Sequence, residues 1–134
     1  MISGGNRNPL YDEPAAVTIV DPALTFPAHQ PDRAVAVAVE LGNGRQALER
    51  ATRLRSTAHM STERQARYLV DIARAHILTR SPTQALQALV KGEQIAPEEL
   101  AETPLVAAVI EDIEAQTKHA RQPALRRLKQ RLYT

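Results

Sequence analysis

The chain has 134 residues, enough for one domain with a hydrophobic core of ordinary size. Aromatic residues make up 3% of the chain and Trp is absent, so the core must be built from Leu, Val, Ile and Ala, which favours packed helices over a β-sandwich. The absence of Cys excludes disulfides, thiolate metal sites and a Cys nucleophile, and it fits a reducing cytoplasm, where we expect the protein to act. The net charge of +2 is too small to indicate nucleic-acid binding by itself, and no stretch approaches a membrane-spanning length.

Residues 1–31 contain five of the nine prolines, so a stable helix is not expected there. We assign residues 1–31 to an irregular leader and residues 32–134 to an α-helical domain. Residues 17–20 (VTIV) have strand propensity, and two interpretations stay open: an extended arm that docks on a neighbour, or simple disorder. The apolar run over residues 15–20 is too short for a signal peptide.

Two helices are predicted next. Residues 32–41 alternate Val with Ala, but both sets are apolar, so the alternation does not indicate a strand, and we predict a helix. The sequence LGNG at 41–44 is a strong helix stop, and a second helix over 45–54 follows it. The expected buried stripe of this second helix consists of Ala47, Leu48, Ala51 and Leu54.

A helical hairpin is predicted over residues 61–97. Its first helix covers 62–79, with Thr62 as the N-cap and Gln65 completing a capping box. After the turn, Ser81 is the expected N-cap of the second helix and Pro82 its first residue. That helix ends near 92–96, before Pro97. The expected apolar positions of the hairpin are Leu69, Ile72, Ala73 and His76 on the first helix, and Ala85, Leu86, Ala88, Leu89 and Val90 on the second.

The pattern repeats along the chain. The pairs at 47–48 and 85–86 are both Ala-Leu and lie 38 residues apart, near the period of helical-hairpin repeats, which stack into a solenoid. A third unit starts at Thr103-Pro104, and a last helix over 122–132 would close the stack. The expected apolar faces of these two helices are Leu105, Val106, Val109, Ile110 and Ile113, and then Leu125, Leu128 and Leu132.

The central hairpin resembles a tetratricopeptide-type (TPR) repeat. The positions that carry the resemblance are, in order, Leu69, Ile72, Ala73, His76, Ala85, Leu89, Gly92 and Pro97. Here His76 replaces the Tyr usual in the family, and Arg80 stands where Gly is common in the turn. Ala73 and Ala85 are small enough to let the two helices approach closely. The resemblance implies an all-α, short TPR-like array of about two and a half repeats with a C-terminal capping helix; the alternative is a generic helical hairpin of a small bundle.

A wider resemblance covers residues 34–133. The segments AVAVAVELGNGRQALERA, ERQARYLVDIARAH, QALVKGEQIAPEEL and TPLVAAVIEDI, with the basic tail, are similar to the C-terminal region of actinobacterial Xre-family helix-turn-helix transcriptional regulators. In that family a TPR-like region is thought to sense a ligand or partner and to mediate association. The proline-rich leader cannot supply a helix-turn-helix, so the resemblance does not carry DNA binding over to this chain.

One helical face carries the candidate binding residues. Arg67, Val70, Arg74 and Ile77 lie at i, i+3, i+7 and i+10 of the 62–79 helix. In TPR-like repeats this face lines the concave groove, and two guanidiniums there could hold a carboxylate or phosphate. The hypothesis is that Arg67 and Arg74 contact an acidic peptide or small anion. The alternative is a solvated charged face, with Glu63 and Asp71 as ion-pair partners.

Other candidate sites are weaker. No two of the histidines at 29, 59, 76 and 119 have a metal-ligand spacing on one helix, and we expect His76 to be a hydrogen-bonded core or groove residue. Glu98 and Glu99 favour a helix N-terminus after Pro97 rather than a catalytic pair. Residues 118–134 hold six Lys or Arg and no acid, which could contact nucleic acid or an anionic membrane, but a capping helix is favoured. Pairing of this tail with the acidic stretch 93–114, within the chain or across a dimer, is also open.

The sequence therefore predicts a non-enzymatic interaction module without metal or cofactor, which binds a peptide or protein partner or its own copy as a homodimer. Direct DNA binding and membrane binding are not expected. The first hypothesis is a sensing region related to bacterial transcriptional regulators. The second is a stand-alone TPR-like adaptor unconnected with transcription. An extended concave surface suits peptide recognition better than a closed catalytic site.

Overall fold

The computed structural model describes residues 31–54, 56–118 and 122–133. This part of the chain is all-helical, as predicted, and contains seven helices and no strand. The predicted arm at 17–20 and nearly all of the predicted leader lie outside the described residues, and the first described helix begins at Pro31. The helices are α3 (Pro31–Glu40), α4 (Gly44–Thr52), α5 (Thr62–Leu78), α6 (Pro82–Ile95), α7 (Pro97–Glu102), α8 (Pro104–Gln116) and α9 (Pro123–Tyr133).

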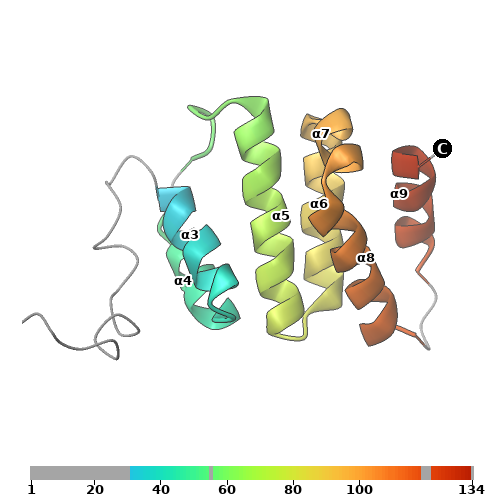
Figure 1. Ribbon diagram of the computed structural model, residues 1–134, viewed down its shortest axis with the longest axis horizontal. Coiled ribbons are helices and arrows are strands. Elements are labelled where there is room, and N and C mark those ends of the chain that lie inside the picture. The colour runs from blue at the N-terminus through green and yellow to red at the C-terminus, as the bar shows by residue number, and fades with distance from the viewer. Residues whose placement is uncertain (1–30, 55, 119–121, 134) are drawn as a thin grey trace, which may run out of the picture.

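The helices stand in a row and alternate in direction (Figure 1). Helices α3, α5 and α8 run one way, whereas α4, α6 and α9 run the other way. Two pairs, α3 with α4 and α5 with α6, are tightly packed hairpins. In the third pair the backbones of α8 and α9 approach each other at few points, because α9 packs against α6 and the short helix α7.

The buried side chains form two clusters that share α5. The first cluster draws on α5, α6, α7, α8 and α9, and its largest fully buried members are Leu89, Leu100, Ile113 and Leu128. The second joins α3, α4 and α5 through Val35, Ala38, Val39, Ala47, Tyr68 and Ala75. Ile72 of α5 packs against both clusters. The expected stripes of the helices at 45–54 and 122–132 lie in these cores.

The start of α5 differs from the prediction by one residue. Ser61, not Thr62, is the N-cap: its backbone is extended and its Oγ accepts a hydrogen bond of 3.2 Å from the Arg64 N–H. The third helical position is then Arg64, so Gln65 completes no capping box and instead donates from Nε2 to the Met60 carbonyl at 2.9 Å. Both neighbouring residues are good caps by type, and the backbone at Ser61 decides between them.

The N-caps after the two later turns are caps by position only. Ser81 precedes Pro82 of α6 and Thr103 precedes Pro104 of α8, but neither side chain makes a capping hydrogen bond. The Ser81 Oγ donates to the Thr79 carbonyl at 3.4 Å, and the Thr103 Oγ1 donates to the Glu99 carbonyl at 2.6 Å. The two hydroxyls therefore stabilise the ends of the preceding helices.

The turn after α3 has a defined hydrogen-bond pattern. The Gly42 N–H donates to the Val39 carbonyl at 2.9 Å, and the Asn43 N–H donates to the Ala38 carbonyl at 2.8 Å. This pair of bonds is a Schellman motif, which requires the residue after the C-cap to adopt a left-handed backbone. Gly42 does so with a φ of 77°, a conformation that glycine adopts without steric cost.

The turn after α5 is the same motif without its glycine. The Arg80 N–H donates to the Ile77 carbonyl at 3.1 Å, and the Ser81 N–H donates to the His76 carbonyl at 2.7 Å. Arg80 has a φ of 61° and lies 38 residues after Gly42. The repeat in the sequence is thus a repeat in backbone geometry, and Arg80 occupies a position that favours glycine.

Small residues let helices approach closely on both sides of α5. Ala73 of α5 and Ala85 of α6 are fully buried in the first core, in agreement with their predicted packing role. On the other side, a Cβ placed on Gly44 of α4 would lie 2.7 Å from the Leu78 Cβ and 2.8 Å from the Ala75 carbonyl oxygen. Gly44 therefore sets how closely α4 can pack on the end of α5.

We predict that Arg80→Gly stabilises the protein. Relieving the left-handed backbone strain, less the entropy that glycine adds to the unfolded chain, should raise the free energy of unfolding by about 0.5–1 kcal/mol, measured by urea denaturation. Arg80→Ala is the matched control because it removes the side chain and keeps the Cβ. Equal stabilisation by Ala and Gly would contradict a backbone origin.

We predict that Gly44→Ala destabilises the protein, although alanine normally favours helices over glycine. The added methyl group meets the backbone carbonyl of Ala75, which cannot move without shifting α5, so we expect a loss of about 1–3 kcal/mol in thermal unfolding. Arg45→Ala, at the exposed next position of α4, should change the stability little. An unchanged melting temperature for Gly44→Ala would show that the interface has room for a methyl group.

Candidate functional site

A groove lies between α3, α5 and α8, the three helices that run in the same direction (Figure 1). Its volume is about 250 Å³. The lining residues are Val39, Arg74, Ile77, Leu78, Leu105, Ala108, Val109 and Asp112. Two of the predicted site residues, Arg74 and Ile77, are thus brought together in one concave surface. The groove is mainly apolar, with one guanidinium and one carboxylate in its wall.

Two leucines expose large apolar surface at this groove. The exposed fractions are 45% for Leu78 and 44% for Leu105. The sequence predicts Leu105 as part of the apolar face of its helix. The other four residues of that face are buried, whereas Leu105 is exposed. The sequence pattern gives no sign that Leu78 is part of a binding surface. Exposed apolar side chains gathered at a hollow are typical of interaction surfaces.

Arg74 is held in place by two carboxylates. Its Nη2 lies 2.9 Å from Oε2 of Glu40 on α3, and its Nη1 donates to Oδ1 of Asp71 at 3.3 Å. Burial raises the pKa of Asp71, and the neighbouring Arg74 opposes this shift. The Glu40 side chain is mostly exposed, so an incoming carboxylate could replace it on Arg74 at small desolvation cost. This geometry suits recognition of an acidic group beside an apolar one.

The other two predicted site residues lie elsewhere. Val70 is 2% exposed and belongs to the first core, so its side chain does not reach the surface. Arg67 is exposed outside the groove, and its Nη2 lies 3.0 Å from Oε2 of Glu99 on α7. Of the ion-pair partners expected for the alternative of a solvated face, Asp71 pairs with Arg74, but Glu63 pairs with neither arginine. The four predicted binding residues of α5 therefore lie in three different environments. Val70 is buried in the core, Arg67 lies outside the groove, and Arg74 and Ile77 line the groove.

Arg67 instead lines a second hollow, of about 310 Å³, near the starts of α3 and α5. There, Arg64 clamps Asp32 with two hydrogen bonds, from Nε to Oδ2 at 2.9 Å and from Nη2 to Oδ1 at 2.6 Å. This hydrogen-bonded guanidinium holds the pKa of Asp32 below its usual value. Nearby, burial raises the pKa of Tyr68 to about 12. The clamp is structural, because it fastens α3 to α5.

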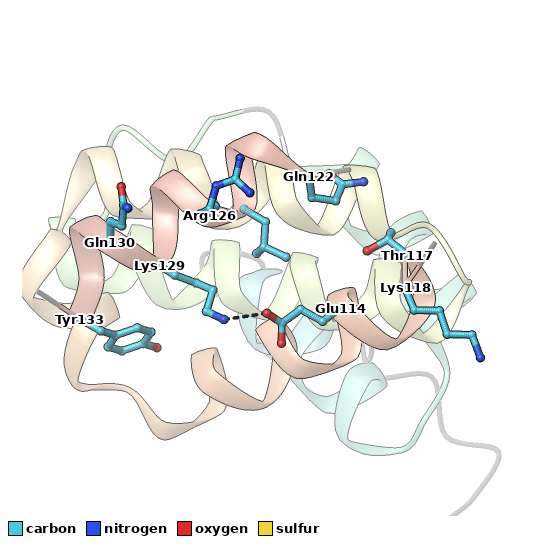
Figure 2. A pocket seen from close by; sticks show the side chains of 9 residues that line it. Glu114, Thr117, Lys118, Gln122, Arg126, Lys129, Gln130 and Tyr133 are labelled. Atoms are coloured by element: carbon cyan, nitrogen blue, oxygen red, sulfur yellow. Dashed lines mark hydrogen bonds and ion pairs between the residues drawn. The ribbon is translucent and has the colours of Figure 1, made fainter. Parts of the chain in front are cut away.

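A third hollow, of about 620 Å³, separates α8 from α9 (Figure 2). Its two walls are joined by an ion pair of 2.7 Å between Lys129 Nζ and Glu114 Oε2. A second pair of 3.0 Å joins Arg131 to Glu93 of α6. Pairing of the basic tail with the acidic stretch therefore occurs within the chain, which was one of the arrangements left open by the sequence.

The described part of the chain contains neither a group of metal-ligating side chains nor a membrane-spanning helix. Among residues 31–54, 56–118 and 122–133, no three His, Asp or Glu side chains are grouped so as to hold a metal ion. No helix in this part of the chain is long and apolar enough to cross a membrane. His76 is half-buried, and desolvation lowers its pKa. Its buried Nδ1 has no hydrogen-bond partner among the described residues, so the expected hydrogen bond is not made at this atom.

Comparison with known proteins adds no relative. No protein-family model matches the chain, and no match is found among curated proteins or solved structures. The similarities to TPR repeats and to the regulator family therefore depend on the residues and segments given above.

We predict that the Asp32–Arg64 clamp makes stability depend on acid pH. Because the folded pKa of Asp32 is lowered, its contribution is present above the unfolded value of about 3.9 and is lost as the pH falls through the lower folded value. Asp32→Asn should lower the melting temperature by a few degrees at pH 7, and this difference should shrink towards the acid limit of the pH range, as followed by circular dichroism.

The matched control for this clamp is Glu63→Gln. Glu63 is exposed in the first turn of α5 and makes no ion pair with any described residue. Its replacement should therefore give a much smaller difference at pH 7. A penalty for Asp32→Asn that stays the same at all pH values would contradict an ionic origin.

Proposed function

We propose that the chain is a non-enzymatic interaction module that binds a peptide or protein partner in the groove between α3, α5 and α8. The observation that carries this proposal is the pair of exposed leucines, Leu78 and Leu105, beside Arg74 in one hollow. The partner segment would place a large apolar side chain between the leucines and a carboxylate on Arg74. Buried apolar anchors supply most of the affinity of such interfaces, and charge pairs add specificity.

We further propose that the helices form a short TPR-like array. Two features support this arrangement: the identical turns at Gly42 and Arg80, and the alternating directions of the helices. In arrays of this kind the first helix of each hairpin contributes to one concave surface, and α3, α5 and α8 occupy these places. The third unit departs from the pattern, because α7 precedes it and α9 leans on α6 and α7.

The biological setting is proposed from sequence resemblance. Similarity to the C-terminal region of Xre-family regulators supports a partner-sensing role in the bacterial cytoplasm, with self-association as one outcome. The competing proposal is a stand-alone adaptor unconnected with transcription. The intact mass of the native gene product distinguishes the two, since a regulator would carry a DNA-reading domain in the same chain.

We predict that peptides selected from a random display library will bind the groove through its leucines. Selected sequences should combine a large apolar residue with a nearby Asp or Glu. Leu78→Ser with Leu105→Ser should weaken the best peptide by about tenfold or more in fluorescence anisotropy, because each leucine loses apolar contact area. Arg74→Lys should weaken acidic peptides more than their amide analogues.

The control for this experiment is Leu41→Ser. Leu41 is 68% exposed and does not line the groove, so its loss should leave binding unchanged. Thermal unfolding of each variant shows whether it is folded. Equal losses for Leu41→Ser and for the double variant, or no selected peptide that depends on the leucines, would refute the proposal.

A further inference from the structure

In each of the first two helix pairs, the first helix of the following pair packs against both helices. Helix α5 packs against α3 and α4, and α8 packs against α5 and α6. The corresponding place on the third pair lies in the angle between α8 and α9. The described residues put no helix there, and the hollow of about 620 Å³ occupies this position. The hollow therefore has the location of a docking site for one more helix.

The hollow offers an exposed aromatic ring and several polar side chains to a bound helix. Tyr133, which is 48% exposed, and Lys118 lie at opposite ends of it (Figure 2). Leu125 lines the hollow but is only 4% exposed, and Gln122 stands with Thr117 near the Lys118 end. The hollow is open to solvent, which suits a segment that lies along it better than an enclosed small molecule.

The charges that line the hollow favour some partner helices over others. The lining contains three cations, Lys118, Arg126 and Lys129, and one carboxylate, Glu114, which is paired with Lys129. Lys118 and Arg126 form no ion pair with any residue that the structure describes. Two uncompensated cations at the rim favour an acidic occupant and disfavour a basic one.

We propose that the hollow between α8 and α9 binds an acidic amphipathic α-helix of a partner protein. The helix would place its apolar side against the ring of Tyr133, and its carboxylates near Lys118 and Arg126. This site is separate from the groove of the proposed function and does not depend on it.

A second copy of the chain is a poorer occupant. In a head-to-tail contact it would offer α3, the first helix that the structure describes. Both acids of α3 are already paired, Asp32 with Arg64 and Glu40 with Arg74. The exposed residue beside Asp32 is the cationic Arg33. Charge complementarity therefore favours a partner with free carboxylates over another copy of this chain.

The test uses the full chain and a synthetic helical peptide as the probe. The fluorescein-labelled peptide carries Leu at i, i+3, i+4 and i+7, Glu at flanking positions and Ala elsewhere. We expect saturable binding in fluorescence anisotropy that weakens as salt is added. Arg126→Glu should weaken binding by about tenfold or more.

Arg127→Glu is the matched control. Arg127 is the next residue of the same helix, is exposed, and does not line the hollow, so the variant has the same net charge as Arg126→Glu. It should bind the peptide nearly as well as the natural chain. A peptide with Lys in place of Glu, and one with Ser in place of Leu, should both bind poorly. The Leu78→Ser, Leu105→Ser variant should bind normally, so that failure here and failure of the groove proposal are separable.

Three outcomes would overturn the inference. Equal loss for Arg126→Glu and Arg127→Glu would indicate general attraction to the basic helix and no docking site. No binding of the acidic peptide by a chain that circular dichroism shows to be folded would exclude the occupant. A concentration-dependent dimer in sedimentation that Arg126→Glu dissociates would make a second copy the occupant in place of a partner.

Discussion

The fold depends on α5 being packed on two sides at once. Each core needs this helix, and Ile72 contacts both of them. A helix can serve two cores only if its neighbours approach closely on both sides, which requires small residues at the contacts. Ala73 and Ala85 meet this need toward α6, and Gly44 meets it toward α4. The low aromatic content of the chain is therefore part of how it folds, because bulky rings at these positions would push the row of helices apart.

The packing of α5 on two sides also creates the groove. Because α5 is covered on two sides, only a narrow strip of it reaches solvent, and Arg74, Ile77 and Leu78 lie on or beside that strip. Glu40 comes to Arg74 from α3, and Leu105 comes to Leu78 from α8. The groove is thus assembled from three helices whose spacing α5 sets, and its guanidinium is oriented before any partner arrives. Such preorganisation lowers the entropy cost of binding.

The sequence predicted most of the helices because their signals are local: prolines at helix starts, a glycine stop at 42, and apolar stripes with the helical period. The prediction failed where contacts with neighbouring helices determine whether a side chain is buried. Val70 shares a helical face with Arg67 and Arg74, yet it is buried, since packing on both sides leaves α5 a strip narrower than that face. Leu105 continues an apolar stripe, yet it is exposed, because α5 and α6 cover only part of α8. The only sign of the left-handed turn at Arg80 in the sequence is that Arg stands where glycine is common.

Helix α8 separates the two proposed surfaces. Leu105, Ala108 and Asp112 face the groove, whereas Glu114 and Thr117 face the hollow beside α9. Between these faces the helix is anchored by Val106, Val109, Ile110 and Ile113 in the first core, and Gln116 donates from Nε2 to the Ile77 carbonyl at 3.1 Å. A partner at either surface would contact side chains of α8, and packing in the core already fixes the position of this helix. Occupation of one surface therefore need not displace the other, and one short row of helices could hold two partners at once.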